Sequence, residues 1–176
     1  MNSVGAAILG VFGALWCAMG LAAWRGGVDA IALSPALVAI VIIVAAEAVN
    51  RRARPPDPAI ARRIGRVVGV ASTFEGIAIF LTASFLSNIG RFDLVMPAIA
   101  VIVGLHFIPI AHASGRLAFL YALASLMLLL AGASLLLPPT AVRVMAVGFG
   151  AALLLWGASM MTLARLWRAA PKASRE

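Results

Sequence analysis

Two ionisable residues lie deep inside apolar stretches of this sequence, where a charged side chain is costly. Glu75 and His106 each occur near the middle of a segment that is long enough to cross a bilayer. A charge at the bilayer centre costs about 2.5–3.5 kcal/mol, and intramembrane ionisable residues mark ion pathways, proton relays or paired polar contacts. These two residues are therefore the first candidates for chemistry.

Helix rise places the two residues at a similar depth. Glu75 follows Arg66 by nine positions, which corresponds to about 13 Å, and His106 precedes Arg116 by ten, or about 15 Å. The segments that carry them are joined by a short loop, so they should be antiparallel neighbours, and we expect Glu75 and His106 to be in contact. In a low dielectric, the neutral and ion-pair states of a carboxyl–imidazole pair come close in free energy. Such a pair can accept and release a proton.

Other residues of the two segments support a polar site. Ser72 and Thr82 recur with Glu75 at helical spacing, and a helix face of small and polar residues should point into a bundle. Pro109 lies three positions after His106 and cannot donate a backbone hydrogen bond, so it should kink its helix. The predicted substrate- or proton-binding residues therefore include Ser72 and Thr82 besides the pair itself.

A second histidine, His112, lies six positions after His106, which places the two rings about 120° apart around a helix. The two histidines cannot ligate one metal ion from a single straight helix face. We interpret His112 as an interfacial side chain, with the cytoplasmic end of a proton path as the alternative. We add it to the candidate residues on that second interpretation.

The composition decides the class of protein. The chain has 176 residues, of which 64% are hydrophobic and 11% charged, and its mean hydropathy is +1.08. Soluble domains carry about 25% charged residues, so lipid must act as the solvent here. We predict an all-α polytopic membrane protein, a six-transmembrane-helix bundle that forms one domain over residues 1–176. The spans are expected at about 4–24, 30–49, 67–88, 94–113, 117–137 and 140–163.

The basic residues predict the orientation of the bundle. Eleven lysines and arginines fall on one side of a six-span arrangement and three on the other, which places both termini in the cytoplasm (N-in/C-in). The eleven lie in a basic loop over 50–66, in the turn at Arg116 and in a tail over 164–176. The three are Arg25, Arg91 and Arg143. Asp57 and Pro58 read as an N-cap and a first helical residue, so the third helix should begin inside the basic loop.

The net charge of +8 does not indicate a nucleic-acid partner, because it is concentrated in short loops beside apolar spans. The basic loop suits anionic lipid headgroups. Arginine outnumbers lysine thirteen to one and alanine is abundant, which is typical of GC-rich bacterial genomes. We therefore expect a multi-pass protein of the bacterial inner (plasma) membrane.

The first span carries small residues at every fourth position, at Ala6, Gly10, Ala14, Ala18 and Ala22. Such a face lets another helix approach closely. The approaching helix can belong to the same chain or to a second copy, so a homo-oligomer formed through this face stays open.

The segment Val103-Gly104-Leu105-His106-Phe107-Ile108-Pro109-Ile110-Ala111 resembles one found in small, uncharacterised bacterial six-helix membrane proteins. The resemblance covers one span and brings no activity. It implies only that His106 and Pro109 belong to a site.

Several functions are consistent with these patterns. We favour a proton-linked transporter of a small solute or ion that uses the Glu75–His106 pair. The alternatives are a membrane-embedded binding protein, with His106 as a ligand to haem or a metal, and an accessory subunit of a membrane complex. An intramembrane enzyme is least favoured, because the sequence lacks HExxH, GxSxG and a pair of intramembrane aspartates. The sequence identifies neither a cofactor nor a metal site.

Overall fold

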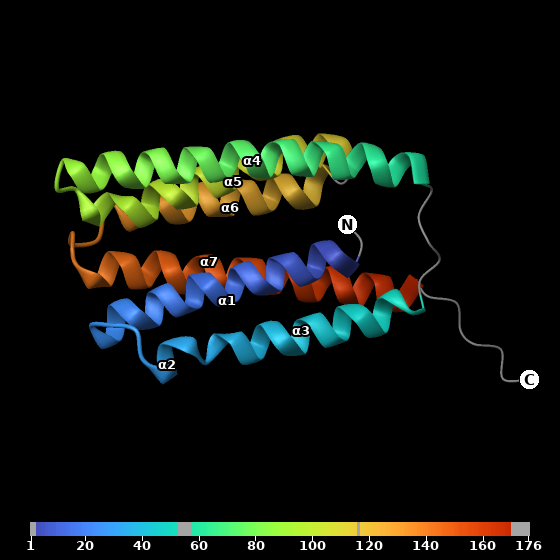
Figure 1. Cartoon of the computed structure of the whole chain (residues 1–176), viewed down its shortest axis with the longest axis horizontal. Helices are drawn as coiled ribbons and strands as arrows, with labels where there is room; N and C mark the ends of the chain where they lie inside the picture. Colours follow the sequence, from blue (N-terminus) through green and yellow to red (C-terminus); the bar gives the residue numbers. More distant parts are fainter. Residues whose placement is uncertain (1–2, 53–57, 116, 170–176) are drawn as a thin grey trace, which may run out of the picture.

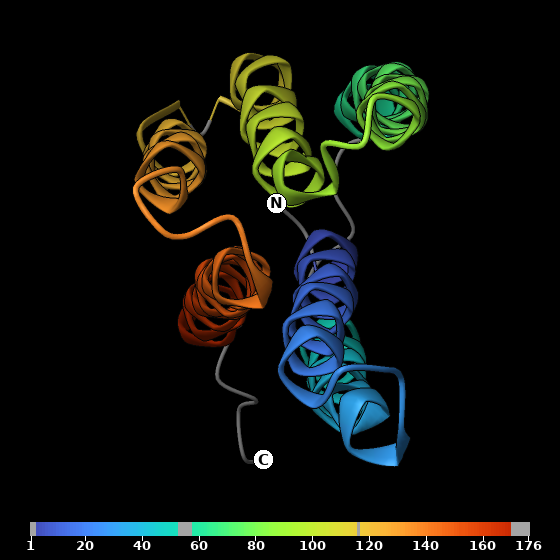
Figure 2. The ribbon, with the colours of Figure 1, turned by 90° about the vertical axis from the view of Figure 1, so that its left-hand side faces the viewer.

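The computed structural model describes residues 3–52, 58–115 and 117–169, and these residues form an all-helical bundle, as predicted. Six main helices make two layers of three, with α4, α5 and α6 in one layer and α7, α1 and α3 in the other (Figure 2). The main helices are α1 (Ser3–Arg25), α3 (Pro35–Asn50), α4 (Pro58–Asn88), α5 (Val95–Ser114), α6 (Leu117–Ser134) and α7 (Ala141–Ala169). Two short elements, α2 (Ala30–Leu33) and η1 (Phe92–Leu94), precede α3 and α5.

Successive helices run in opposite directions along the bundle (Figure 1). The beginning of α1, the beginning of α4 and the end of α7 lie at one end, and the connections that contain Arg25 and Arg91 lie at the other. This is the alternation that the six-span prediction requires. The assignment of the first end to the cytoplasm stays a prediction, and four of the basic residues on which it drew (Arg54, Arg116, Lys172 and Arg175) lie outside the described residues. Helix α4 begins at Pro58 as predicted, and Asp57, its predicted N-cap, also lies outside the described residues.

Two helix ends differ from the sequence prediction. Helix α6 ends at Ser134 and not near residue 137, because the Ser134 hydroxyl donates to the carbonyl of Ala131 and the next residues form turn hydrogen bonds. Helix α7 continues to Ala169, past the expected end at 163, since neither proline nor glycine occurs over residues 164–169. The guanidinium of Arg52 lies 4.1 Å from the centre of the Trp167 ring, so this extension contacts the end of α3.

Local signals explain the break between α2 and α3. Asp29 caps α2, and its carboxylate accepts a hydrogen bond of 2.8 Å from the Ala32 amide. That hydrogen bond, followed by one from the Arg25 side chain, holds the pKa of the Asp29 carboxyl below its ordinary value. The contribution of the cap to stability is therefore present at neutral pH and is lost as the pH falls through this lowered pKa. Pro35 then occupies the first position of α3, where a missing backbone N–H costs no hydrogen bond.

The tightest contact of the bundle joins α1 to α7. A Cβ atom added to Gly148 would lie 2.8 Å from the Cα atom of Gly20, so the two backbones touch. Nearer the other end of the same interface, the Trp156 indole donates to the Gly10 carbonyl at 3.1 Å, and the Ser159 hydroxyl donates to the Ala6 carbonyl at 2.8 Å. In lipid, where apolar burial drives little association, close backbone approach and such hydrogen bonds hold helices together.

The small-residue face of the first span is therefore used within the chain. Ala6 is 0% exposed, and Gly10 lies against Ile42 of α3. Ala14 is also buried. A homo-oligomer formed through these residues would have to displace α3 and α7, and it stays a prediction.

A buried ion pair joins the two layers at the Arg91 end of the bundle. Arg143, at the beginning of α7, is 6% exposed, and its guanidinium donates to the Asp93 carboxylate of η1 at 2.7 Å. It also donates to the carbonyl of Leu137 at 2.7 Å. Asp93 in turn accepts from Arg91 at 3.1 Å. The sequence analysis counted Arg143 only as one of the three basic residues on its side of the bundle, so this pair required the structure.

We expect Gly148→Ala to destabilise the bundle by about 1–3 kcal/mol, because the added methyl group meets backbone atoms that cannot rotate away. Unfolding of the purified protein in mixed micelles measures the effect. Gly157→Ala is the matched control on α7, since a Cβ there meets nothing within 4 Å. Equal stability of the two variants would contradict a backbone contact at Gly148.

We expect Asp93→Asn to lower the thermal midpoint of the detergent-solubilised protein, because it leaves the Arg143 guanidinium buried without its carboxylate. Asp29→Asn is the control: it removes an exposed carboxylate partner of Arg25 and keeps a side chain that can cap α2. A midpoint for Asp93→Asn that matches that of Asp29→Asn would show that the buried pair adds no stability.

Candidate functional site

Glu75 of α4 and His106 of α5 are in contact, as expected. The Glu75 Oε2 and His106 Nδ1 atoms are 3.4 Å apart, and the side chains are 12% and 10% exposed. This distance is longer than the ordinary 2.7–3.2 Å hydrogen bond. Within the described part of the chain, His106 Nδ1 is buried and has no hydrogen-bond partner. The two groups are thus placed to share a proton without a fixed hydrogen bond between them.

The packing of α4 on α5 sets this geometry. Among the described elements, α4 has extensive contacts only with α5 and a smaller one with the adjoining η1. Ala71 lies four positions before Glu75 and Ala78 three positions after it, and both border the space between α4 and α5. Small side chains there let the His106 ring approach the α4 backbone. On the other side, the edge of the ring meets Phe107 at 5.8 Å between ring centres.

A groove of about 570 Å³ runs beside the pair, between α4 and α5, and we call it the Arg66 groove. Arg66 lies at its α4 N-terminal end, and Glu75 and His106 line it farther along. Pro109, three positions after His106, also lines it. Its other walls are apolar side chains of the two helices: Val67, Val70, Ala71, Phe74, Ala78, Ile102 and Leu105.

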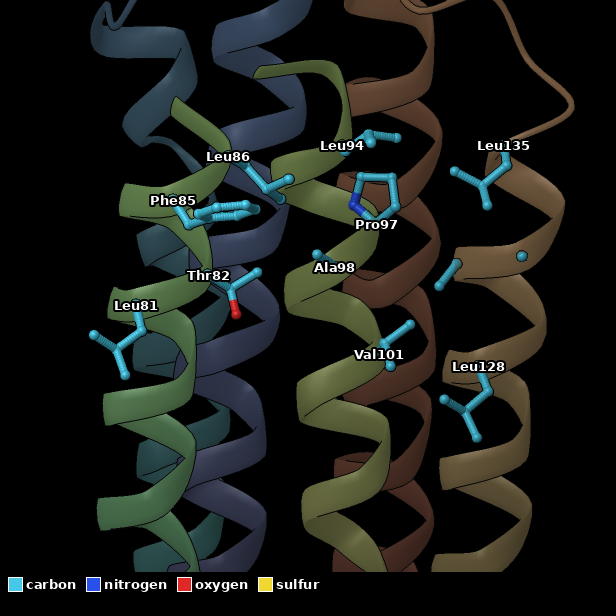
Figure 3. Close-up of a pocket in the computed structure, with 12 residues that line it drawn as sticks. Leu81, Thr82, Phe85, Leu86, Leu94, Pro97, Ala98, Val101, Leu128 and Leu135 are labelled. Carbon is cyan, nitrogen blue, oxygen red and sulfur yellow. The ribbon is translucent and has the colours of Figure 1, made fainter. Parts of the chain in front are cut away.

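A second groove of about 640 Å³ lies nearer the Arg91 end and is bounded by α4, α5 and α6 (Figure 3). We call it the Thr82 groove, because Thr82 is the one hydroxyl-bearing residue among those that line it. Leu81 and Phe85 of α4, Val101 of α5 and Leu128 of α6 are among its apolar walls. The structure therefore places Thr82 beside a cavity, one groove away from the Glu75–His106 pair.

The remaining candidates lie apart from the pair. Ser72 is exposed on α4 and lines neither groove. His112 is exposed near the end of α5, and its Nδ1 atom lies 3.0 Å from the hydroxyl of Tyr121 on α6. The structure therefore turns His112 toward α6, while His106 faces α4. The sequence analysis did not predict the Tyr121 contact. It could have done so, because Tyr121 follows His112 by nine positions across a short turn, which brings the two helices side by side.

No group of three or more His, Cys, Asp or Glu side chains comes together in the described part of the chain. Cys17 of α1 is a half-buried free thiol. A metal or haem ligand role for His106 stays an alternative prediction.

The length and composition of the helices are those of a multi-pass integral membrane protein. Within the residues that the structure describes, five segments are long and apolar enough to cross a bilayer: Ser3–Arg25, Ala30–Asn50, Pro58–Asn88, Phe92–Ser114 and Ala141–Ala169. Helix α6 is a shorter apolar helix of the same bundle. No family model, curated protein or solved structure matches the chain.

We expect the double variant Glu75→Leu/His106→Leu to be about as stable as the wild type, because interhelical polar contacts in membranes average only about 0.6 kcal/mol and apolar replacement of a buried pair is often neutral. His106→Leu alone should be less stable than the double variant, since it leaves the carboxyl without its partner. Thermal unfolding in detergent measures all three. A loss of several kcal/mol in the double variant would assign the pair to structure.

Proposed function

We propose that this protein is a proton-linked transporter of a small solute or ion, located in the bacterial inner membrane with both termini in the cytoplasm. Glu75 and His106 hold the exchangeable proton. The observation that carries the proposal is the 3.4 Å separation of Glu75 Oε2 and His106 Nδ1 beside an open groove. Two titratable groups that face each other at mid-span, next to a space that a solute can enter, are the minimum that coupling requires.

The proton step uses atoms of these two side chains alone. In the proton-loaded state, Glu75 is a neutral acid or His106 is an imidazolium, and the pair carries one proton more than in the unloaded state. The unloaded pair is a carboxylate beside a neutral imidazole. The Oε2–Nδ1 contact of 3.4 Å leaves both atoms close enough for one proton to reside on either group. A solute that binds beside the pair can therefore change the free energy of one state more than that of the other.

The fold supports movement at this interface more than elsewhere. The contacts of α4 with the rest of the described chain are chiefly those with α5, whereas α1 is fixed to α7 by backbone contact and two interhelical hydrogen bonds. Alternating access needs one part of a bundle to move against another. Among the six main helices of the described chain, α4 is the one that can shift while breaking the fewest contacts with the others.

Proteoliposomes with an internal pH dye and an imposed pH gradient test the proposal. We expect at least one solute from a panel of carboxylates, amines and neutral polar compounds to drive proton movement through the wild type. Glu75→Gln and His106→Gln should reduce this movement to the protein-free level, because neither amide titrates. Tyr121→Phe is the control, since it removes a hydroxyl near His112 and leaves the pair intact. Full proton movement in Glu75→Gln, or none with any solute in the wild type, would refute the proposal.

A further inference from the structure

The end of the bundle that is predicted to face the cytoplasm carries an excess of basic side chains. The end of α3, the beginning of α4 and the end of α7 meet there (Figure 1). Glu47 is the one acidic residue of the described chain at this end, and its carboxylate pairs with Arg51 at 2.9 Å. The remaining arginines of this end are exposed and have no ion pair within the described residues: Arg52, Arg62, Arg63, Arg66, Arg165 and Arg168.

Arg52 differs from the other arginines of this end, because a second helix sets its position closely. Its Cζ atom lies 4.1 Å from the centre of the Trp167 ring of α7. The helix ends behind this contact are joined as well. Ser3 of α1 donates to the side chain of Asn50 on α3 at 2.9 Å, and Leu163 of α7 is buried in a small core that α1 and α3 share. The guanidinium is therefore held against the ring at a fixed place on the protein surface.

Stacking on the indole leaves the hydrogen-bond donors of Arg52 free. A guanidinium is planar and carries its N–H groups in that plane, so a ring against its face does not occupy them. The Arg52 guanidinium donates to no acceptor in the described part of the chain, whereas that of the neighbouring Arg51 donates to Glu47. A planar fork of free donors matches two oxygens of a phosphate group, and such charge-assisted bidentate contacts are strong.

The protein surface beneath this contact suits the chains of a lipid. Tryptophan rings gather at the level of the lipid headgroups, and Trp167 is 49% exposed. Met160 and Leu153, seven and fourteen positions before Trp167 on the same face of α7, are exposed. Val41, eleven positions before Arg52 on α3, is also exposed. A phosphate bound at Arg52 therefore has apolar side chains below it, along which acyl chains can lie.

We infer that the Arg52–Trp167 contact is a binding site for one anionic phospholipid of the cytoplasmic leaflet. The lipid phosphate accepts hydrogen bonds from the Arg52 guanidinium, the Trp167 ring keeps this guanidinium at headgroup depth, and the acyl chains lie along α3 and α7. Arg168, which follows the ring directly, adds a second positive charge. A zwitterionic headgroup would bring its own cation toward these arginines, so the site selects a lipid with net negative charge. The site is separate from the Glu75–His106 pair and does not depend on the proposed transport function.

Native mass spectrometry of the full-length protein in detergent tests the ligand class, because it resolves the first bound lipid. Phosphatidylglycerol and phosphatidylcholine with the same acyl chains are titrated in parallel. The first phosphatidylglycerol should bind at least about tenfold more tightly than the first phosphatidylcholine. Equal affinities would overturn the site. An equimolar amount of glycerol 3-phosphate, which has the anion without the chains, should leave the bound lipid in place, and displacement by it would assign the site to a soluble anion and overturn the lipid.

Arg52→Gln should weaken the binding of the first phosphatidylglycerol about tenfold, because the phosphate loses its bidentate partner. Arg62→Gln is the matched control: it removes an equally exposed charge at the same end of the bundle, on α4, that contacts no aromatic ring. It should change the affinity less than twofold. Equal effects of the two substitutions would assign the attraction to general surface charge and overturn the site.

Trp167→Leu tests the part played by the ring, since it removes no charge. Phosphatidylglycerol should bind about threefold more weakly, because the Arg52 guanidinium loses the contact that positions it. Trp24→Leu is the control, an exposed tryptophan at the opposite end of the bundle, and it should leave the affinity unchanged. An unchanged affinity in Trp167→Leu would show that the stacked contact does not form the site and would overturn the inference.

Discussion

Helix α4 is joined to the rest of the described chain chiefly through α5, and the Glu75–His106 contact lies inside that single interface. None of its 31 residues is classed as buried, although it is the longest helix of the bundle. A carboxyl group in the middle of such a helix would face hydrocarbon if α5 were absent, at a cost of about 2.5 kcal/mol or more. The packing of α4 on α5 therefore determines both where α4 lies and how well the Glu75–His106 pair is shielded from lipid.

Helices α1 and α7, in the other layer of the bundle, are joined much more closely than α4 and α5. Gly148 and Gly20 bring the backbones of α7 and α1 into contact, and the Trp156 and Ser159 side chains donate to carbonyls of the facing helix. These contacts fix one relative position of the two helices, because a small shift would produce a clash or break a hydrogen bond. Helices α1 and α7 are thus held by backbone contact and interhelical hydrogen bonds, whereas α4 is held chiefly by its packing on α5.

The features that the sequence predicts best are those that depend on one helix or on one short connection. Apolar lengths predict the helices, and Pro35 predicts the break before α3. The Glu75–His106 contact was predictable because a short loop makes the two spans neighbours and helix rise matches their depths. The Gly148–Gly20 contact and the Arg143–Asp93 pair each join residues that are far apart in the chain. Helical spacing within one segment carries no information about which distant helix it meets, so these contacts required the structure.

The Arg143–Asp93 pair also makes the two ends of the α4–α5 interface different. It ties η1, and with it the first turn of α5, to the beginning of α7, and the short connection from Asn88 holds the end of α4 close by. At the opposite end, α4 begins at Pro58 and meets α5 beside Pro109, where the α5 backbone lacks a donor. The interface is thus anchored at the Arg91 end and least restrained at the Arg66 end. In the proposed function, a movement of α4 that follows a change in the charge of the Glu75–His106 pair would therefore open at the mouth of the Arg66 groove.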